Sequence, residues 1–170
     1  MSQLEQHRSV ACPLAQAAMR LKHFFQQHGN ADGDTVKLSI GIDLDVPGLP
    51  APLALQRSVV VTVRPHHLAA DMEPRYLVQW APELHGPFPL FEGELVVEGG
   101  DDYNTFVLCL RGNYTPPLGL VGKGFDAVVG NRVAQATADG LLHRIRDSIE
   151  QAFGVDEARK LPAKPLGDNS

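Results

Sequence analysis

The chain has 170 residues, of which 44% are hydrophobic and 21% are charged, and it carries a formal net charge of −5. This length allows one domain with a sizeable core, and the composition is typical of a soluble globular protein. The 15 Lys and Arg residues are scattered along the sequence. Without a basic cluster, nucleic-acid binding is not expected.

The two cysteines, Cys12 and Cys109, do not form a CxxC motif. Two isolated thiols are typical of a reducing compartment, and a structural disulfide is the less favoured interpretation. The N-terminal segment lacks the apolar core of a signal peptide, and no run of about 18 apolar residues follows it. We therefore expect a cytoplasmic protein without a membrane span.

The first helical pattern covers residues 13–28. Pro13 suits the first position of a helix, and Gly29 is a stop signal. Between them, apolar residues recur at helical spacing: Leu14, Ala17, Ala18, Leu21, Phe24 and Phe25. We interpret the preceding stretch, Arg8–Cys12, as a short first strand and Asn30–Asp34 as a polar turn.

Five segments have the character of β-strands and are separated by turns that contain Gly, Pro and Asp. They are Lys37–Val46, Ser58–Arg64, Arg75–Ala81, Phe91–Gly99 and Thr105–Tyr114. The first alternates strictly between apolar and polar residues, which predicts a strand with one face buried and one in water. Consecutive strands with short links predict an antiparallel meander.

The longest element is a helix predicted from about Phe125 to Phe153. Its apolar stripe consists of Ala134, Ala138, Leu141, Leu142, Ile145, Ile149 and Ala152. A helix of about 28 residues is about 42 Å long and can cross a whole sheet. The pattern is lost in residues 154–170, which we interpret as a disordered or loosely packed tail after a single domain of residues 1–153.

The segment between the last strand and this helix, Tyr114–Arg132, is rich in glycine and contains two prolines. It does not match a phosphate-binding P-loop, because Gly122 and Lys123 are followed by Gly124 and the required spacing to an earlier glycine is absent. Prolines end strand pairing, and glycines permit close approach of the backbone. We interpret the segment as a structural corner.

The same segment carries the pattern Y-x-P-P-x-G-x-x-G at Tyr114–Gly122 and D-x-x-x-G-x-R at Asp126–Arg132. This resembles the corner between the last strand and the last helix in the START-like (SRPBCC) superfamily, which includes pollen-allergen and polyketide cyclase types. The order of elements extends the resemblance over residues 8–153. The superfamily usually has seven strands and often two short helices after the first strand, whereas this sequence shows five or six strands and one such helix.

The resemblance implies an α+β helix-grip fold, in which a curved antiparallel sheet wraps around a long C-terminal helix, with a short N-terminal helix. It also implies a cavity between sheet and long helix that often holds apolar small molecules. The superfamily has no shared catalytic motif, so the catalytic residues are unknown and no cofactor is expected.

The predicted cavity is supported by residue size along the long helix. Inward positions are small in its first half and large in its second half, which leaves room beside the first half. The facing strands direct aromatic side chains to the same space, as small-molecule sites usually require. The candidate ligand-binding residues are Tyr76, Trp80, Phe91, Phe106, Leu108, Tyr114, Asn131, Ala134 and Ala138. The alternative is that these are ordinary core residues.

Metal binding is not predicted. The adjacent residues His66 and His67 would point apart on an extended strand, and His23 and His28 do not have the helical spacing for shared ligation. Cys109 lies within a strand, where a packed thiol is the common case.

Three functions remain open. The first is binding of a hydrophobic small molecule in the predicted cavity. The second is a cyclase- or dehydratase-like enzyme, which needs a titratable group in that cavity; His85 and Arg75 are the nearest. The third is a ligand-free interaction module or homodimer, which an exposed apolar patch at Leu77, Val60 and Val107 would favour.

Overall fold

The computed structural model describes residues 2–42, 58–66, 73–83, 88–116 and 127–161. Within these residues, seven strands form one antiparallel sheet in the order β1-β7-β6-β5-β4-β3-β2. The strands are β1 Ser2–Val10, β2 Asn30–Asp32, β3 Thr35–Gly41, β4 Ser58–Pro65, β5 Arg75–Pro82, β6 Leu90–Gly99 and β7 Phe106–Thr115. The helices are the 3-10 turn η1 Leu14–Gln16, α1 Ala17–His28 and α3 Ala127–Lys160.

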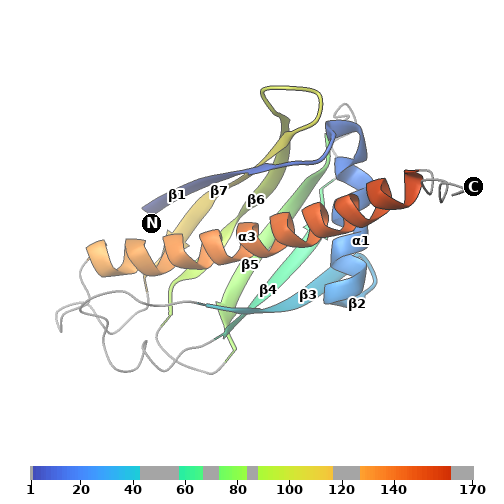
Figure 1. Ribbon diagram of the computed structural model, residues 1–170. Coiled ribbons are helices and arrows are strands. Elements are labelled where there is room, and N and C mark those ends of the chain that lie inside the picture. Colours follow the sequence, from blue (N-terminus) through green and yellow to red (C-terminus); the bar gives the residue numbers. More distant parts are fainter. Residues whose placement is uncertain (1, 43–57, 67–72, 84–87, 117–126, 162–170) are drawn as a thin grey trace, which may run out of the picture.

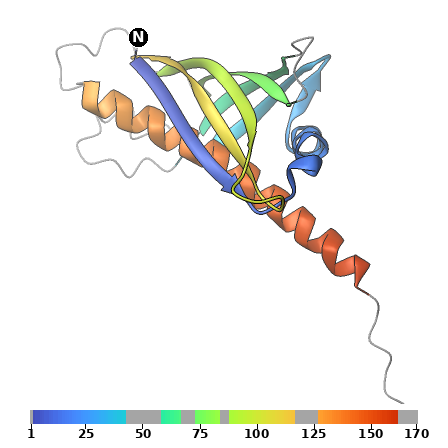
Figure 2. The ribbon, with the colours of Figure 1, turned by 90° about the horizontal axis from the view of Figure 1, so that it is seen from above.

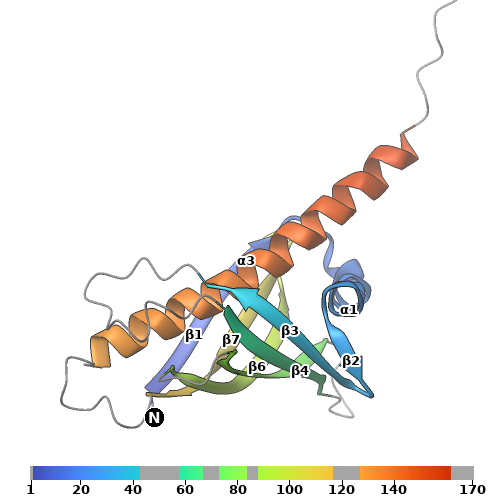
Figure 3. The same cartoon turned by 90° about the horizontal axis from the view of Figure 1, so that it is seen from below.

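The sheet is strongly curved, and α3 runs along its concave side (Figures 1 and 2). The shorter helix α1 contacts both α3 and β3. The C-terminal part of α3 projects beyond the sheet, as the view from below also shows (Figure 3). This arrangement is the predicted α+β helix-grip fold, which is therefore confirmed.

Strand β1 begins at Ser2, so the predicted first strand at Arg8–Cys12 was placed too late. Leu4 and Val10 are buried, but Gln6 and Arg8 occupy the inward positions between them and interrupt the apolar alternation. Arg8 is an ion-pair partner of Asp139 on α3, which explains why a charged side chain is accommodated there. The edge strand is therefore held partly by polar contacts that periodicity does not register.

The predicted polar turn at Asn30–Asp34 contains a further strand, β2, that pairs with β3. The chain reverses at Gly33, whose φ of 61° lies in the left-handed region that glycine adopts without strain. All three β2 residues are exposed, so no buried alternation marks the strand in the sequence. With β1 and β2 counted, the strand number equals the usual number for the fold that the sequence resembled.

Helix α3 continues to Lys160, seven residues past its predicted end at Phe153. The first part of the predicted tail is thus helical. Two contacts with α1 hold this extension: Arg20 forms an ion pair of 2.7 Å with Asp156, and its guanidinium lies 5.7 Å from the centre of the Phe153 ring. The extension needs no apolar stripe because it projects past the sheet.

The core lies between the concave face of the sheet and α3. Six of the seven stripe residues predicted on α3 are buried, and Ala152 is partly buried. On the strands, alternation also holds: Val78 and Trp80 are buried, whereas Leu77 and Gln79 are exposed. Full burial of one such aliphatic side chain stabilises the fold by about 1.5–3 kcal/mol. Neither α1 nor α3 has a segment apolar enough for a bilayer span within the described residues.

Besides the single residues His67 and His85, three segments of the sequence predictions lie outside the described residues. These are the end of the strand predicted to reach Val46, residues 117–126 of the predicted corner, and the tail from residue 162.

Candidate functional site

An aromatic platform lies on the concave face of three neighbouring strands. Trp80 of β5 pairs in register with Phe91 of β6, which pairs with Tyr114 of β7. The Trp80 and Phe91 rings are stacked, with centroids 4.1 Å apart and planes 13° from parallel. The indole nitrogen of Trp80 donates a hydrogen bond of 3.2 Å to the carbonyl oxygen of Pro89, so its buried polar group is satisfied.

Two glycines lie beside the platform and leave room for the Phe91 ring. Gly93 and Gly112 face each other across β6 and β7. A Cβ atom on either would approach the Cζ atom of Phe91 to 2.5 Å and 2.8 Å, so the Phe91 ring lies directly over the glycine pair. The small residues Ala134 and Ala138 belong to the same core on the N-terminal half of α3, which lies over this end of the sheet (Figures 1 and 2).

The nine predicted ligand-binding residues fall into two groups. Seven are part of the core and no more than 3% exposed: Trp80, Phe91, Phe106, Leu108, Tyr114, Ala134 and Ala138. At that exposure, water scarcely reaches them. The other two, Tyr76 and Asn131, are partly exposed, and Tyr76 packs against the margin of the core. A ligand in contact with the platform would therefore have to displace side chains.

A pocket of about 570 Å³ opens where β4 ends and β5 begins, between these strands, α1 and the β2–β3 hairpin. We call it the α1 pocket. Its apolar lining comes from Phe25, Val36, Val63 and Tyr76. The Phe25 and Tyr76 rings lie 5.0 Å apart, and burial raises the pKa of the Tyr76 hydroxyl. Polar lining residues are Lys22, Asp34, His66, Glu73 and Arg75.

Of the residues singled out from the sequence for a cavity, Tyr76 and Arg75 line this pocket. The other residues of the pocket were not predicted. The sequence feature that could have indicated them is Phe25, which directly follows Phe24 on α1 and therefore lies on a different side of the helix. Two adjacent aromatic residues on one helix cannot pack into the same place, since successive side chains are about 100° apart. Which surface Phe25 covers depends on how α1 docks, and that is a tertiary property.

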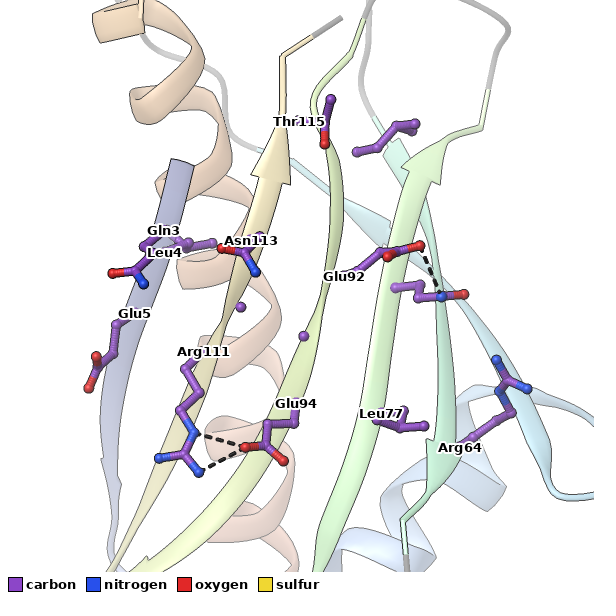
Figure 4. Close-up of a pocket in the computed structure, with 14 residues that line it drawn as sticks. Gln3, Leu4, Glu5, Arg64, Leu77, Glu92, Glu94, Arg111, Asn113 and Thr115 are labelled. Atoms are coloured by element: carbon purple, nitrogen blue, oxygen red, sulfur yellow. Dashed lines mark hydrogen bonds and ion pairs between the residues drawn. The ribbon is translucent and has the colours of Figure 1, made fainter. Parts of the chain in front are cut away.

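A second hollow, of about 950 Å³, lies on the face of the sheet turned away from α3 (Figure 4). Polar side chains of its lining bind one another: Arg111 donates hydrogen bonds of 2.9 Å and 2.8 Å to Glu94, and Gln79 donates one of 3.3 Å to Glu92. Leu77 is 40% exposed here, but its register neighbours are Arg64 and Glu94. This surface is polar around Leu77 and suits an apolar molecule less well than the α1 pocket.

No protein-family model matches the sequence, and no curated protein matches it. Solved structures do match. The Zhui aromatase/cyclase from Streptomyces sp. R1128 is 12% identical, with a TM-score of 0.55 over 97% of this chain and 99% of the other. A conserved protein from Geobacillus kaustophilus is 11% identical, with a TM-score of 0.58 over 91% and 97%. A START superfamily protein from Mycobacterium smegmatis is 11% identical, with a TM-score of 0.52 over 90% and 97%.

These matches and the geometry define the class of fold as helix-grip. More particularly, the chain has the START-like fold, and the resemblance seen at Tyr114–Arg132 is confirmed at that level. At such low identity the likeness concerns the fold. The function has to be argued from the pockets and side chains of this chain.

Proposed function

We propose that the protein binds an apolar or amphipathic small molecule on the concave side of its sheet, and that the α1 pocket is where the ligand enters. The observation that carries this proposal is the α1 pocket itself, with its volume of about 570 Å³ and its apolar floor. Ligand sites are usually concave, of about 300–1,000 Å³, and apolar with a few polar groups. The α1 pocket has all three properties.

The composition of the lining indicates the ligand class. Phe25, Val36, Val63 and Tyr76 would bury an apolar body, and the margin supplies both basic and acidic groups. Lys22 is exposed and carries a flexible ammonium that can meet a polar or anionic end of the ligand. An amphipathic molecule would therefore bind in the pocket better than a purely apolar one, because it can contact both the apolar and the charged lining residues.

In this proposal, the ligand reaches from the α1 pocket toward the space between sheet and long helix where the sequence predicts a cavity. Tyr76 and Trp80 are both on the concave side of β5, four residues and thus about 13 Å apart. The Phe91 ring lies over Gly93 and Gly112, in the register row between the rows of Tyr76 and Trp80. In this proposal, a ligand that extends from the α1 pocket to the platform displaces the Phe91 ring.

The enzyme alternative has less support. Arg75 is 3.8 Å from Glu94, an ion pair that draws its guanidinium toward the outer face of the sheet. His85 lies outside the described residues. No observation on the described residues favours catalysis over binding.

Binding in the α1 pocket can be tested with the fluorescent amphipathic probe 1-anilinonaphthalene-8-sulfonate and a matched pair of variants. Ala18 is exposed on α1 and lines the pocket, so Ala18→Phe fills the pocket without disturbing the core. Ala15 is equally exposed but does not line it. We expect Ala18→Phe to weaken probe binding at least about fivefold, which corresponds to about 1 kcal/mol, and Ala15→Phe to leave it unchanged. Equal binding by both variants would place the probe elsewhere and contradict the proposal.

A further inference from the structure

Three side chains with metal-binding chemistry meet on the outer face of the sheet, at the edge formed by β1 and β7. They are Glu5, His7 and Cys109, which we call the Cys109 cluster. His7 pairs in register with Cys109, and Glu5 lies two residues before His7 on the same face. One donor atom from each residue lies within 4.8 Å of the other two, and His7 Nε2 is 2.8 Å from Glu5 Oε1.

The donor set is one that zinc uses. A thiolate, an imidazole and a carboxylate bind Zn²⁺ at about 2.3, 2.0–2.1 and 2.0–2.2 Å. In a tetrahedral site these lengths place the donors roughly 3.3–3.7 Å apart, so a cluster within 4.8 Å has to contract only slightly. Cys109 is 1% exposed and held in place, whereas the side chains of His7 and Glu5 are 50% and 61% exposed and can rotate inward.

The surrounding charges favour a cation. Three carboxylates, those of Glu98, Glu5 and Glu94, are close enough to the Cys109 sulfur to act on it electrostatically, with Arg111 as the opposing positive charge. Arg111 is itself paired with Glu94. These carboxylates attract a divalent cation, and such a cation takes the place of the thiol proton when it binds.

We propose that Glu5, His7 and Cys109 bind one Zn²⁺ ion, with the fourth coordination position open to solvent. The Cys109 thiol releases its proton to water as the zinc–sulfur bond forms. No metal site is predicted from the sequence, because His7 and Cys109 are far apart along the chain. The cluster exists only because the N-terminal strand pairs with the last strand. This site is independent of the α1 pocket, so either proposal stands or fails alone.

Titration of the full-length, tag-free, chelator-treated protein tests the proposal. Native mass spectrometry should show one Zn²⁺ bound per chain, and Co²⁺ should produce the near-ultraviolet charge-transfer band of a thiolate ligand. Cys109→Ser should abolish that band. His7→Gln and Glu5→Gln alter exposed side chains, so they should fold normally and weaken Zn²⁺ binding by about tenfold or more.

The chain offers a matched control in His143 and Asp147 on α3. This pair is 3.0 Å apart and as exposed as His7 and Glu5, but it has no thiol among its described partners. His143→Gln should therefore leave Zn²⁺ affinity and the Co²⁺ spectrum unchanged. The proposal is overturned if the wild-type protein binds no Zn²⁺ at micromolar concentration. It is also overturned if His143→Gln weakens binding as much as His7→Gln does, or if the Co²⁺ complex lacks a thiolate band.

Discussion

Gly93 and Gly112 show how single residues shape the concave face. Their backbones face each other across β6 and β7, and the Phe91 ring occupies the space that side chains would take. A Cβ atom on Gly93 would lie 2.3 Å from the carbonyl oxygen of Arg111, which is backbone and cannot move aside easily. Glycine within a strand usually weakens that strand. Here glycine is required at position 93, because the Phe91 ring and the backbone of the partner strand approach too closely to admit a side chain.

We expect Gly93→Ala to destabilise the protein by about 1–3 kcal/mol, because overpacking forces strand or ring to shift. Gly99→Ala is the matched control on the same strand, since a Cβ atom there meets only the side chain of Leu14 at 3.8 Å. Urea unfolding followed by circular dichroism measures both changes. If the two variants were equally stable, the packing of Phe91 over Gly93 would be looser than the structure shows.

At the scale of elements, the C-terminal extension of α3 depends on α1. Arg20 is buried and donates hydrogen bonds to Gln16 at 2.9 and 3.1 Å and to Asp156 at 2.7 Å. The hydrogen bond from Arg20 lowers the pKa of the Asp156 carboxyl. A carboxyl with a lowered pKa stabilises the folded form at pH values above its ordinary pKa, and this contribution is lost as the pH falls through the lowered value.

Asp156→Asn should therefore loosen residues 154–160, and hydrogen exchange in that segment should become several-fold faster at neutral pH. Lowering the pH below the ordinary carboxyl range should reduce the protection factor of this segment, which is the intrinsic exchange rate at that pH divided by the observed rate, in the wild type but should change it much less in the variant. Asp147→Asn is the control, because Asp147 pairs with Arg146 and His143 on the exposed surface of the same helix. Unchanged exchange in Asp156→Asn would mean that contacts other than the Arg20 ion pair hold the end of α3.

At the scale of the molecule, the first and last elements of the described chain, β1 and α3, are joined to each other by polar contacts. Strand β1 is tied to α3 by Arg8 with Asp139, and the backbone N–H of Ala11 donates a hydrogen bond of 2.8 Å to Glu150. The first strand, the last strand and the last helix thus close the fold together. Such contacts join distant parts of the chain, and they favour cooperative unfolding.

Ile145→Ala should therefore lower the stability of the whole protein by about 2–5 kcal/mol, since it leaves a cavity at the centre of the core. Trp80 is the only tryptophan, so its fluorescence reports on the platform while far-ultraviolet circular dichroism reports on all elements. Both signals should shift to the same lower urea midpoint. Val128→Ala, at a side chain 55% exposed, should change stability by no more than about 0.5 kcal/mol. Separate midpoints for the two signals in Ile145→Ala would show that the sheet and α3 unfold independently.

Local pattern was sufficient for much of the fold. The alternation predicted for β3 and β5 agrees with the burial of every second residue there, and the apolar stripe predicted on α3 agrees with the burial of one face of that helix. These features were predictable because each depends only on nearby sequence. The corner motif at Tyr114–Arg132 then indicated the START-like class, which the solved structures bear out as a fold.

What local pattern missed has one physical cause. Strand β1 and the end of α3 are stabilised by backbone pairing or polar contacts with partners far away in the sequence, so they carry little apolar periodicity of their own. Strand β2 pairs with the neighbouring strand β3, but all its residues are exposed, so it carries no apolar periodicity either. The α1 pocket and the Cys109 cluster depend in the same way on docking and register: Phe25 meets Tyr76, and His7 meets Cys109, only after the sheet has closed. The sequence by itself determined the apolar faces of β3, β5 and α3 and hence the class of fold. Only the tertiary structure decided which side chains share a pocket, because those distances are set by packing between elements and not by spacing within one.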